Sequence, residues 1–375
     1  MKLVLAIPSL CAGGAERVMS RMATYWSSAG VSVTVLTLRP TDEDFYTLPD
    51  SVGRVSLNIR HIAKNRLEAA ATMLLATLRL RRVVRSVRPD AVISFIETMN
   101  VCSLLGLAGT NIPVIVSERI DPREYPTSSL LNRLRRWLYP RARRVVVQTE
   151  AVRQWAEEIV PADRISVIPN PIAAPPPAAS TGAVALSGRT VVAMGRMVPQ
   201  KGFDLLIEAF ARSASSRPEW SLVILGDGEE RKSLVALAEG LGIADRVCMP
   251  GRVKEPAEYL RGSEIFVLSS RYEGFPNALC EAMALGLPVI STDCPSGPSD
   301  IVRDGIDGLL VPTGSAEAIS VAISRLMADA SERRRLATAA AEITERFGVE
   351  LVMRLWEAAL GTSALRRPEL SREER

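Results

Sequence analysis

Short apolar runs alternate with helix-like segments through the first 170 residues of the chain. The segment from Leu67 to Val87 has helical spacing of its apolar residues. Continuous apolar runs, without polar residues at every second position, are typical of strands in a parallel sheet that is covered on both faces. We therefore predict a doubly wound α/β domain, whose strands are LVLAIPS, VSVTVLTL, AVISFI, PVIVSE and RVVVQT.

The same alternation resumes after a segment without charge. Residues 170–188, NPIAAPPPAASTGAVALSG, are rich in Pro, Ala and Ser, as linkers often are. We predict two Rossmann-like domains at residues 1–170 and 189–346, joined by a linker at 171–188, because 375 residues suffice for two cores of ordinary size. The predicted strands of the second domain are TVVAMG, SLVILG, VCMPG, IFVLSS, PVIST and GLLVP.

Two apolar segments have a membrane-related alternative. MKLVLAIPSL has the Lys and apolar stretch of a signal peptide, but it runs into a Gly-Gly loop and a helix, so we interpret it as a first strand. Residues 99–116 carry no charge over 18 positions, the length at which a membrane span is suspected. Asn100, Asn111 and Pro113 favour a helix followed by a buried strand. Five cysteines without paired spacing indicate reduced thiols and a cytoplasmic location.

The segment RYEGFPNALCE holds two carboxylates, Glu273 and Glu281, eight positions apart. It follows a predicted strand and opens a predicted helix, with Pro276 just before the helix and Gly286 at its end. Ligands of open α/β sheets bind at the carboxyl ends of strands, where a helix N-terminus favours a diphosphate. Glu281 is placed to accept hydrogen bonds from a ribose diol, and Glu273 lies nearer a reacting sugar. The alternative is a helix-capping acid and a solvated one.

A second segment, GRMVPQKGFDLL, places two cations on the loop that follows the first strand of the second domain. Arg196 and Lys201 lie five positions apart, and only five of the 46 basic residues are Lys. Arg binds phosphate oxygens with two parallel hydrogen bonds and Lys adds a point charge, so the pair suits a leaving diphosphate. The alternative is two solvated surface charges.

Taken together with GGAER, LVILGDG and DGIDGLLVP, these motifs resemble the retaining glycosyltransferases of family 4, which have the GT-B fold. The resemblance covers nearly the whole chain. It implies that Arg196 and Lys201 bind the donor diphosphate, that Glu273 lies beside the donor sugar and that Glu281 binds the ribose. It also implies that the terminal helix, at about 347–361, packs back on the first domain. The donor-binding set that we expect is completed by Gly274, Phe275, Pro276, Asn277, Ala278, Gly195, Arg252 and Val253.

The acceptor side of the site is less well defined. Gly13 and Gly14 open a helix after the first strand and are expected to border the cleft, whereas the loop is not the GxGxxG of dinucleotide-binding proteins. Many relatives carry a His after the strand that here ends in Ser117, and this chain has Glu118 and Arg119 instead. Either could face the cleft. The single histidine, His61, lies in a different segment.

Net charge differs between the two halves. Residues 1–170 carry +8 and residues 171–375 carry −4. The excess is concentrated in RLRRVVRSVR and NRLRRWLYPRARR, where arginines alternate with Leu, Val, Trp and Tyr. This pattern is typical of a surface that contacts anionic lipid, with solvated helix faces as the alternative. No nucleic-acid-binding motif accompanies the charge.

The predicted activity is transfer of a sugar from a nucleotide diphosphate donor, UDP-linked, to a hydroxyl of a lipid-linked glycan, with retained α configuration. We expect no cofactor and no metal, since there is no DxD motif and the two cations with a helix N-terminus can stabilise the leaving diphosphate. We expect the protein at the inner face of the plasma membrane. The alternatives are an inactive sugar-nucleotide-binding or membrane scaffold protein and a GT-B epimerase or phosphorylase.

Overall fold

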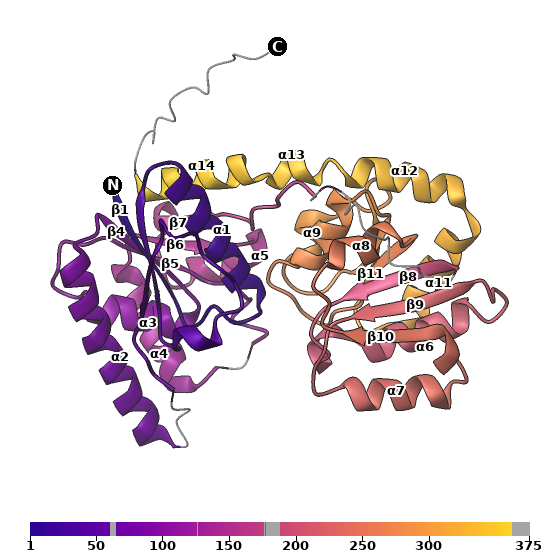
Figure 1. The fold of residues 1–375 in the computed structure, drawn as a ribbon, viewed down its shortest axis with the longest axis horizontal. Coiled ribbons are helices and arrows are strands. Elements are labelled where there is room, and N and C mark those ends of the chain that lie inside the picture. The colour runs from indigo at the N-terminus through magenta and orange to yellow at the C-terminus, as the bar shows by residue number, and fades with distance from the viewer. Residues whose placement is uncertain (61–64, 126, 176, 178–187, 362–375) are drawn as a thin grey trace, which may run out of the picture. The chain divides into compact units, whose positions relative to one another are not determined.

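The computed structural model describes residues 1–60, 65–125, 127–175, 177 and 188–361 (Figure 1). Its contacts divide the chain into two compact units. The first comprises Met1–Asn170 together with the chain from Val352 onward, and the second comprises Pro171–Leu351. Most of the predicted linker, as well as His61, lies outside the described residues.

The first unit is built on a parallel sheet with the strand order β3-β2-β1-β4-β5-β6-β7. Five of these strands were predicted. The short edge strands β3 and β7 were not, because four and three residues carry too little apolar pattern. The strands are β1 Lys2–Ile7, β2 Ser32–Thr37, β3 Gly53–Ser56, β4 Ala91–Phe95, β5 Val114–Ser117, β6 Arg144–Val147 and β7 Ile165–Val167.

Helices cover both faces of this sheet, as the unbroken apolar strands require. One core cluster contains Leu80, Val101 and Leu138, so α2, α3 and α4 contribute to the same layer. The helices are α1 Gly14–Ser28, α2 Arg66–Val87, α3 Glu97–Gly106, α4 Ser129–Leu138 and α5 Glu150–Glu157. The uncharged segment 99–116 forms α3 and β5, as predicted. Among the helices that the structure describes, none is both long enough and apolar enough to cross a membrane.

The last helix of the chain, α14 (Val349–Leu360), packs within the first unit. The ring of its buried Trp356 lies 5.7 Å from the ring of Phe95 in β4. The helix is separated from α13 (Ile343–Phe347) by Gly348, where an added Cβ would clash with the carbonyl oxygen of Thr344. The predicted terminal helix at about 347–361 is thus observed as α14, with Gly348 at the position before it.

The second unit contains a parallel sheet in the order β10-β9-β8-β11-β12-β13, and all six strands were predicted. The strands are β8 Arg189–Met194, β9 Trp220–Leu225, β10 Val247–Gly251, β11 Ile265–Leu268, β12 Val289–Thr292 and β13 Leu309–Val311. Its helices are α6 Phe203–Ser213, α7 Arg231–Gly240, α8 Pro256–Arg261, α9 Asn277–Ala284, α10 Pro298–Ile301, α11 Ala316–Ala328, α12 Ala330–Ala340 and α13. Both units are thus Rossmann-like, as predicted.

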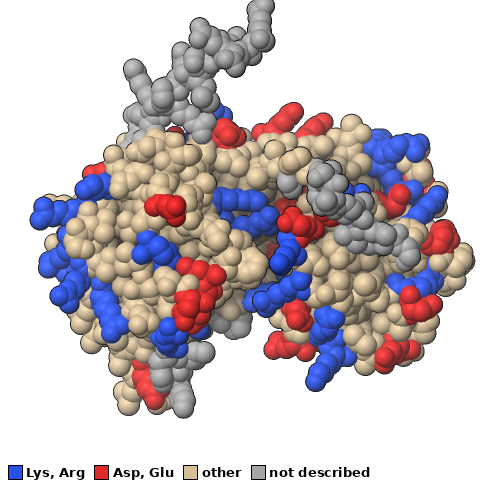
Figure 2. Space-filling view, in the orientation of Figure 1, with Lys and Arg blue, Asp and Glu red and all other residues tan. Residues whose placement is uncertain are grey.

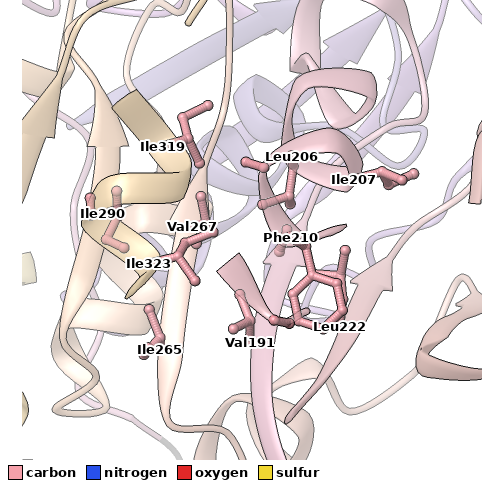
Figure 3. Close-up of a cluster of buried hydrophobic side chains, with 14 of the residues drawn as sticks. Val191, Leu206, Ile207, Phe210, Leu222, Ile265, Val267, Ile290, Ile319 and Ile323 are labelled. Atoms are coloured by element: carbon pink, nitrogen blue, oxygen red, sulfur yellow. The ribbon is translucent and has the colours of Figure 1, made fainter. Parts of the chain in front are cut away.

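Helices α6 and α11 pack on one face of this sheet (Figure 3). Leu206 and Phe210 of α6 meet Ile319 and Ile323 of α11 above the strand residue Val191. These side chains are fully buried. This core holds β8 and β11 side by side, and because β9 lies on the other side of β8, the strand order reverses there. Such a point is where open α/β sheets bind ligands.

Candidate active site

The loops that follow β8 and β11 contact each other through backbone at close range. Gly202 adopts a left-handed conformation, with φ of 60°, and an added Cβ would clash with the carbonyl oxygen of Ser269. Ser269 in turn donates from its hydroxyl to the carbonyl oxygen of Lys201 at 2.9 Å. Glycine is therefore required at position 202 because both φ and space exclude a side chain.

Lys201 and Glu273 form the centre of this arrangement. Lys201 Nζ lies 2.5 Å from Glu273 Oε1, and the Ser270 hydroxyl donates to the same oxygen at 2.6 Å. The side chains of Lys201 and Glu273 are only 17% and 7% exposed. The structure thus brings together one cation and one carboxylate from the two motifs that the sequence singled out. It places them at the carboxyl ends of adjacent strands.

Arg271 and Asp204 connect the same two loops and were not recognised from the sequence. Arg271 makes two hydrogen bonds to the Asp204 carboxylate, at 2.9 and 2.6 Å, and a third to the carbonyl oxygen of Pro199 at 2.7 Å. Hydrogen bonding to Arg271, together with its charge, lowers the pKa of Asp204 against the opposing effect of burial. Gln200 adds a hydrogen bond to the carbonyl oxygen of Tyr272 at 2.9 Å. These contacts fix the position of Lys201 relative to Glu273.

The predicted donor-binding residues lie on the loops around this pair. Gly195 precedes Arg196, whose side chain is exposed, and a Cβ at Gly195 would come within 3.2 Å of Lys201 Cε. Arg252 is exposed and Val253 is partly buried on the loop after β10. Because β9 separates β10 from β8, these two residues lie two strands away from Lys201 along the sheet.

The EGFPN segment is largely buried. Glu273, Gly274, Phe275 and Pro276 are all buried, whereas Asn277 and Ala278 at the start of α9 are partly exposed. The Phe275 ring packs edge-on against Phe347 at 5.6 Å. Helix α9 begins at Asn277 and ends at Ala284, as predicted within two residues, and Glu281 is partly exposed in its second turn.

The loop after β12 contacts the EGFPN segment through its backbone. The Glu273 backbone donates to the carbonyl oxygen of Pro295 at 3.3 Å, and Gly297, with φ of 112°, comes too close to Gly274 to accept a side chain. Burial, and next the charge of Glu273, raise the pKa of the Cys294 thiol to about 12. Cys294 is therefore a buried neutral thiol.

Gly13 and Gly14 begin α1, as predicted. The backbone of Gly13 is extended, its carbonyl oxygen accepts a hydrogen bond from the Tyr46 hydroxyl at 3.1 Å, and the carboxylate of Glu16 lies against its Cα, where a Cβ would stand. The Ser9 hydroxyl donates to Glu16 at 3.5 Å. Glu16 thus already covers the glycine loop.

Glu118 and Arg119 have different environments. Glu118 is 1% exposed, and Arg135 Nε lies 2.9 Å from its Oε1, which also accepts from the Tyr139 hydroxyl. Burial raises the pKa of Glu118 to about 7, although Arg135 and Tyr139 act in the opposite direction. This buried carboxylate is not offered to an acceptor. Sequence reasoning could not detect this, because its partners are 17 and 21 positions away.

Arg119 is partly exposed and stacks on the Phe95 ring at 4.2 Å. It donates to the Asn170 side chain, whose oxygen also accepts from Gln148 at 2.7 Å. Burial lowers the pKa of Arg119 to about 9, and the charge of Glu16 opposes that shift. Of the two residues that replace the expected His, Arg119 is the more exposed.

Comparison with known protein families agrees with this geometry. Residues 183–343 match the model described as glycosyl transferases group 1, and residues 12–174 match the model of glycosyltransferase family 4. The chain belongs to the group 1 glycosyltransferases. Its fold resembles that of sucrose-phosphate synthase from Thermosynechococcus elongatus, with a TM-score of 0.83, 20% identity, and coverage of 97% of this chain and 100% of the other. HepE from Anabaena gives 0.78 at 18% identity, with 96% and 100% coverage. The fold is therefore GT-B, as predicted.

Several relatives carry names that refer to polysaccharides or lipid-linked glycans. The amylovoran biosynthesis glycosyltransferase AmsD of Erwinia amylovora is 27% identical over 96% of this chain and 99% of its own length. An α-1,4-N-acetyl-D-galactosaminyltransferase of Campylobacter jejuni, which acts on an undecaprenol-diphosphate-linked glycan, is 25% identical over 95% and 97%. An exopolysaccharide phosphotransferase of Streptomyces coelicolor is 38% identical over 57% of this chain, which spans only 22% of that relative.

Proposed function

We propose that this glycosyltransferase moves a sugar from a UDP-linked donor to a hydroxyl of a lipid-linked glycan, with retention of the α configuration. The observation that carries the proposal is the contact between Lys201 and Glu273 at the reversal point of the second sheet. A buried ion pair costs desolvation energy and is weak evidence for stability alone, so its position at the ligand-binding end of the sheet favours a role in the reaction.

In the proposed mechanism, Lys201 and Arg196 stabilise the negative charge that develops on the leaving diphosphate. Lys201 is held in place by the Arg271–Asp204 ion pair and by Ser269, so little reorganisation is needed when that charge forms. Glu281 binds the ribose and Glu273 lies beside the donor sugar, with Ser270 and Lys201 fixing its carboxylate. The acceptor hydroxyl attacks from the face that the diphosphate leaves, and its proton passes to the departing phosphate oxygen. We propose that no metal takes part.

On the acceptor side, Arg119 and the glycines Gly13 and Gly14 border the bound glycan in this proposal. The Arg119 guanidinium donates to the side chains of Ser117 and Asn170, and its positive charge favours an anionic group of the acceptor. Lipid-linked acceptors are supported by the Campylobacter relative, and polysaccharide assembly by AmsD. The basic first unit, with +8 over residues 1–170, favours an anionic membrane surface at the cytoplasmic face.

A donor screen tests the proposal. The purified chain is incubated with UDP- and GDP-sugars and a bacterial membrane extract, and products are followed by release of the nucleotide diphosphate and by the anomeric signals of the new glycoside. Transfer from a UDP-sugar with an α linkage is expected. Conversion of the UDP-sugar without an acceptor would identify an epimerase. Binding without any turnover would identify a scaffold protein, and a β product would refute retention.

A further inference from the structure

Helix α2 presents apolar side chains on its exposed side. Leu67, Leu74 and Leu78 are 85%, 61% and 57% exposed, and they recur at spacings of seven and four, which places them on one stripe of the helix. Leu75 lies beside them and is 43% exposed. The helix needs none of these leucines for its own core, because Ala76, Leu80 and Val84 already fill that role on the opposite stripe.

The same stripe continues into exposed arginines. Arg82, Arg85 and Arg88 are exposed at the C-terminal end of α2, and Figure 2 shows Lys and Arg side chains gathered over that end of the helix. Two other arginines of α2 are not free to bind lipid phosphates. Arg81 donates to the carbonyl oxygens of Gly106 and Ala108, at 2.8 and 3.0 Å, and Arg79 donates to that of Leu57 at 2.6 Å. These two arginines therefore have structural contacts within the first unit.

Helix α4 repeats this combination. Leu130 and Trp137 are 57% and 56% exposed, with the exposed Arg133 between them on the same stripe. The Arg141 guanidinium lies 4.1 Å from the centre of the Trp137 ring. Helix α3 packs against both α2 and α4, so the two stripes belong to one helical layer of the first unit.

We infer that the exposed side of α2 and α4 lies in the surface of an anionic lipid bilayer. Leucines of α2 enter the acyl boundary, exposed arginines pair with lipid phosphates, and Trp137 lies at the headgroup level, where tryptophan is favoured. The positive charge beside the apolar stripe favours anionic lipid as the partner of this surface, because it complements anionic headgroups. This inference deepens the proposed function and rests on it, since a lipid surface is where a lipid-linked acceptor is found.

The first test measures binding of the full chain to vesicles of phosphatidylglycerol and phosphatidylcholine, without any sugar nucleotide. The double variant Leu74→Ser and Leu78→Ser should lower the partition coefficient about 100-fold, because each buried leucine contributes about tenfold. Val321→Ser is the matched control, since Val321 is 63% exposed on α11 of the second unit, and its binding should not change.

The charge is tested in the same assay. Arg82→Gln with Arg85→Gln should weaken binding to these vesicles by about tenfold or more, and should have little effect on the weaker binding to pure phosphatidylcholine. Arg334→Gln, a change at an exposed arginine of α12, is the control for loss of a charge outside the proposed lipid-binding surface. Equal binding of the wild type and both α2 variants overturns the inference.

Trp137 supplies a readout in the wild-type chain that does not depend on the folding of a variant. The other four tryptophans, Trp26, Trp155, Trp220 and Trp356, are at most 8% exposed. Lipids brominated on the acyl chain should therefore quench the Trp137 emission, and Trp137→Phe should abolish that quenching. Absence of quenching, or self-association through the leucine stripe by light scattering, refutes the lipid assignment.

These measurements are independent of sugar transfer. If vesicle binding behaves as expected and the donor screen finds no transfer, the proposed function fails while the lipid surface stands. If transfer to a glycan in solution occurs without vesicle binding, the lipid surface fails and the proposed function stands.

Discussion

The contact between Lys201 and Glu273 predicts that stability and turnover will respond differently to the same substitutions. Lys201→Met leaves the Glu273 carboxylate, whose side chain is 7% exposed, with Ser270 as its remaining side-chain donor in the described structure. Removing one partner of a buried ion pair costs about 3–5 kcal/mol, and the 17% exposure of Lys201 places the expected loss near the lower value.

Removing both charges should restore most of this stability. In the double variant Lys201→Met and Glu273→Gln no uncompensated charge is buried, so the free energy of unfolding should return to within about 1 kcal/mol of wild type. Turnover should not return. Both variants lack the cation that we propose to stabilise the leaving diphosphate, so kcat should fall about 10² to 10³-fold in each.

Urea unfolding of the full chain, with hydrogen exchange of β11 amides as the local probe of the second unit, measures the stability effect. Initial rates with the donor found in the screen measure the catalytic one. Lys232→Met, a change at an exposed lysine of α7, is the matched control and should leave both unchanged. Recovery of turnover in the double variant would refute the catalytic assignment, and wild-type stability of Lys201→Met would refute the buried pair.

Further substitutions probe the rest of the site. Arg196→Ala should lower kcat about 10² to 10³-fold, and near-normal turnover would remove Arg196 from the diphosphate site. Glu281→Gln should mainly raise the donor KM, whereas an isolated fall in kcat would exclude ribose binding. Asp204→Asn should lower kcat because Arg271 loses its ionic partner. Recovery of kcat in a variant in which Asp204 and Arg271 are exchanged would show that the pair acts by positioning Lys201. Since the pKa of Glu118 is raised to about 7 by burial, its contribution to stability is present below its ordinary pKa of 4.5 and is lost as pH rises through 7. Glu118→Gln should flatten that dependence in thermal melts between pH 4.5 and 7.

The elements that form the cores could be predicted from the sequence, and the contacts between charged groups could not. The six strands of the second unit are unbroken apolar runs, so a local pattern sufficed. Arg271 and Asp204 are 67 positions apart, and no local pattern pairs them. Glu118 was expected to be accessible because glutamate is rarely buried. Only the fold brings Arg135 close enough to form an ion pair with it.

The two passages of the chain at the boundary of the second unit lie side by side. The backbone N–H of Ile172 donates to the carbonyl oxygen of Phe347 at 2.8 Å, and Ile172 forms a parallel bridge with Gly348. The segment from 172 to 348 therefore begins and ends at one place, as inserted domains do. Such a segment can be exchanged as a cassette between homologous enzymes with two junctions. Recombination at this point would exchange the second unit, which we propose to bind the donor, and would leave the first unit intact.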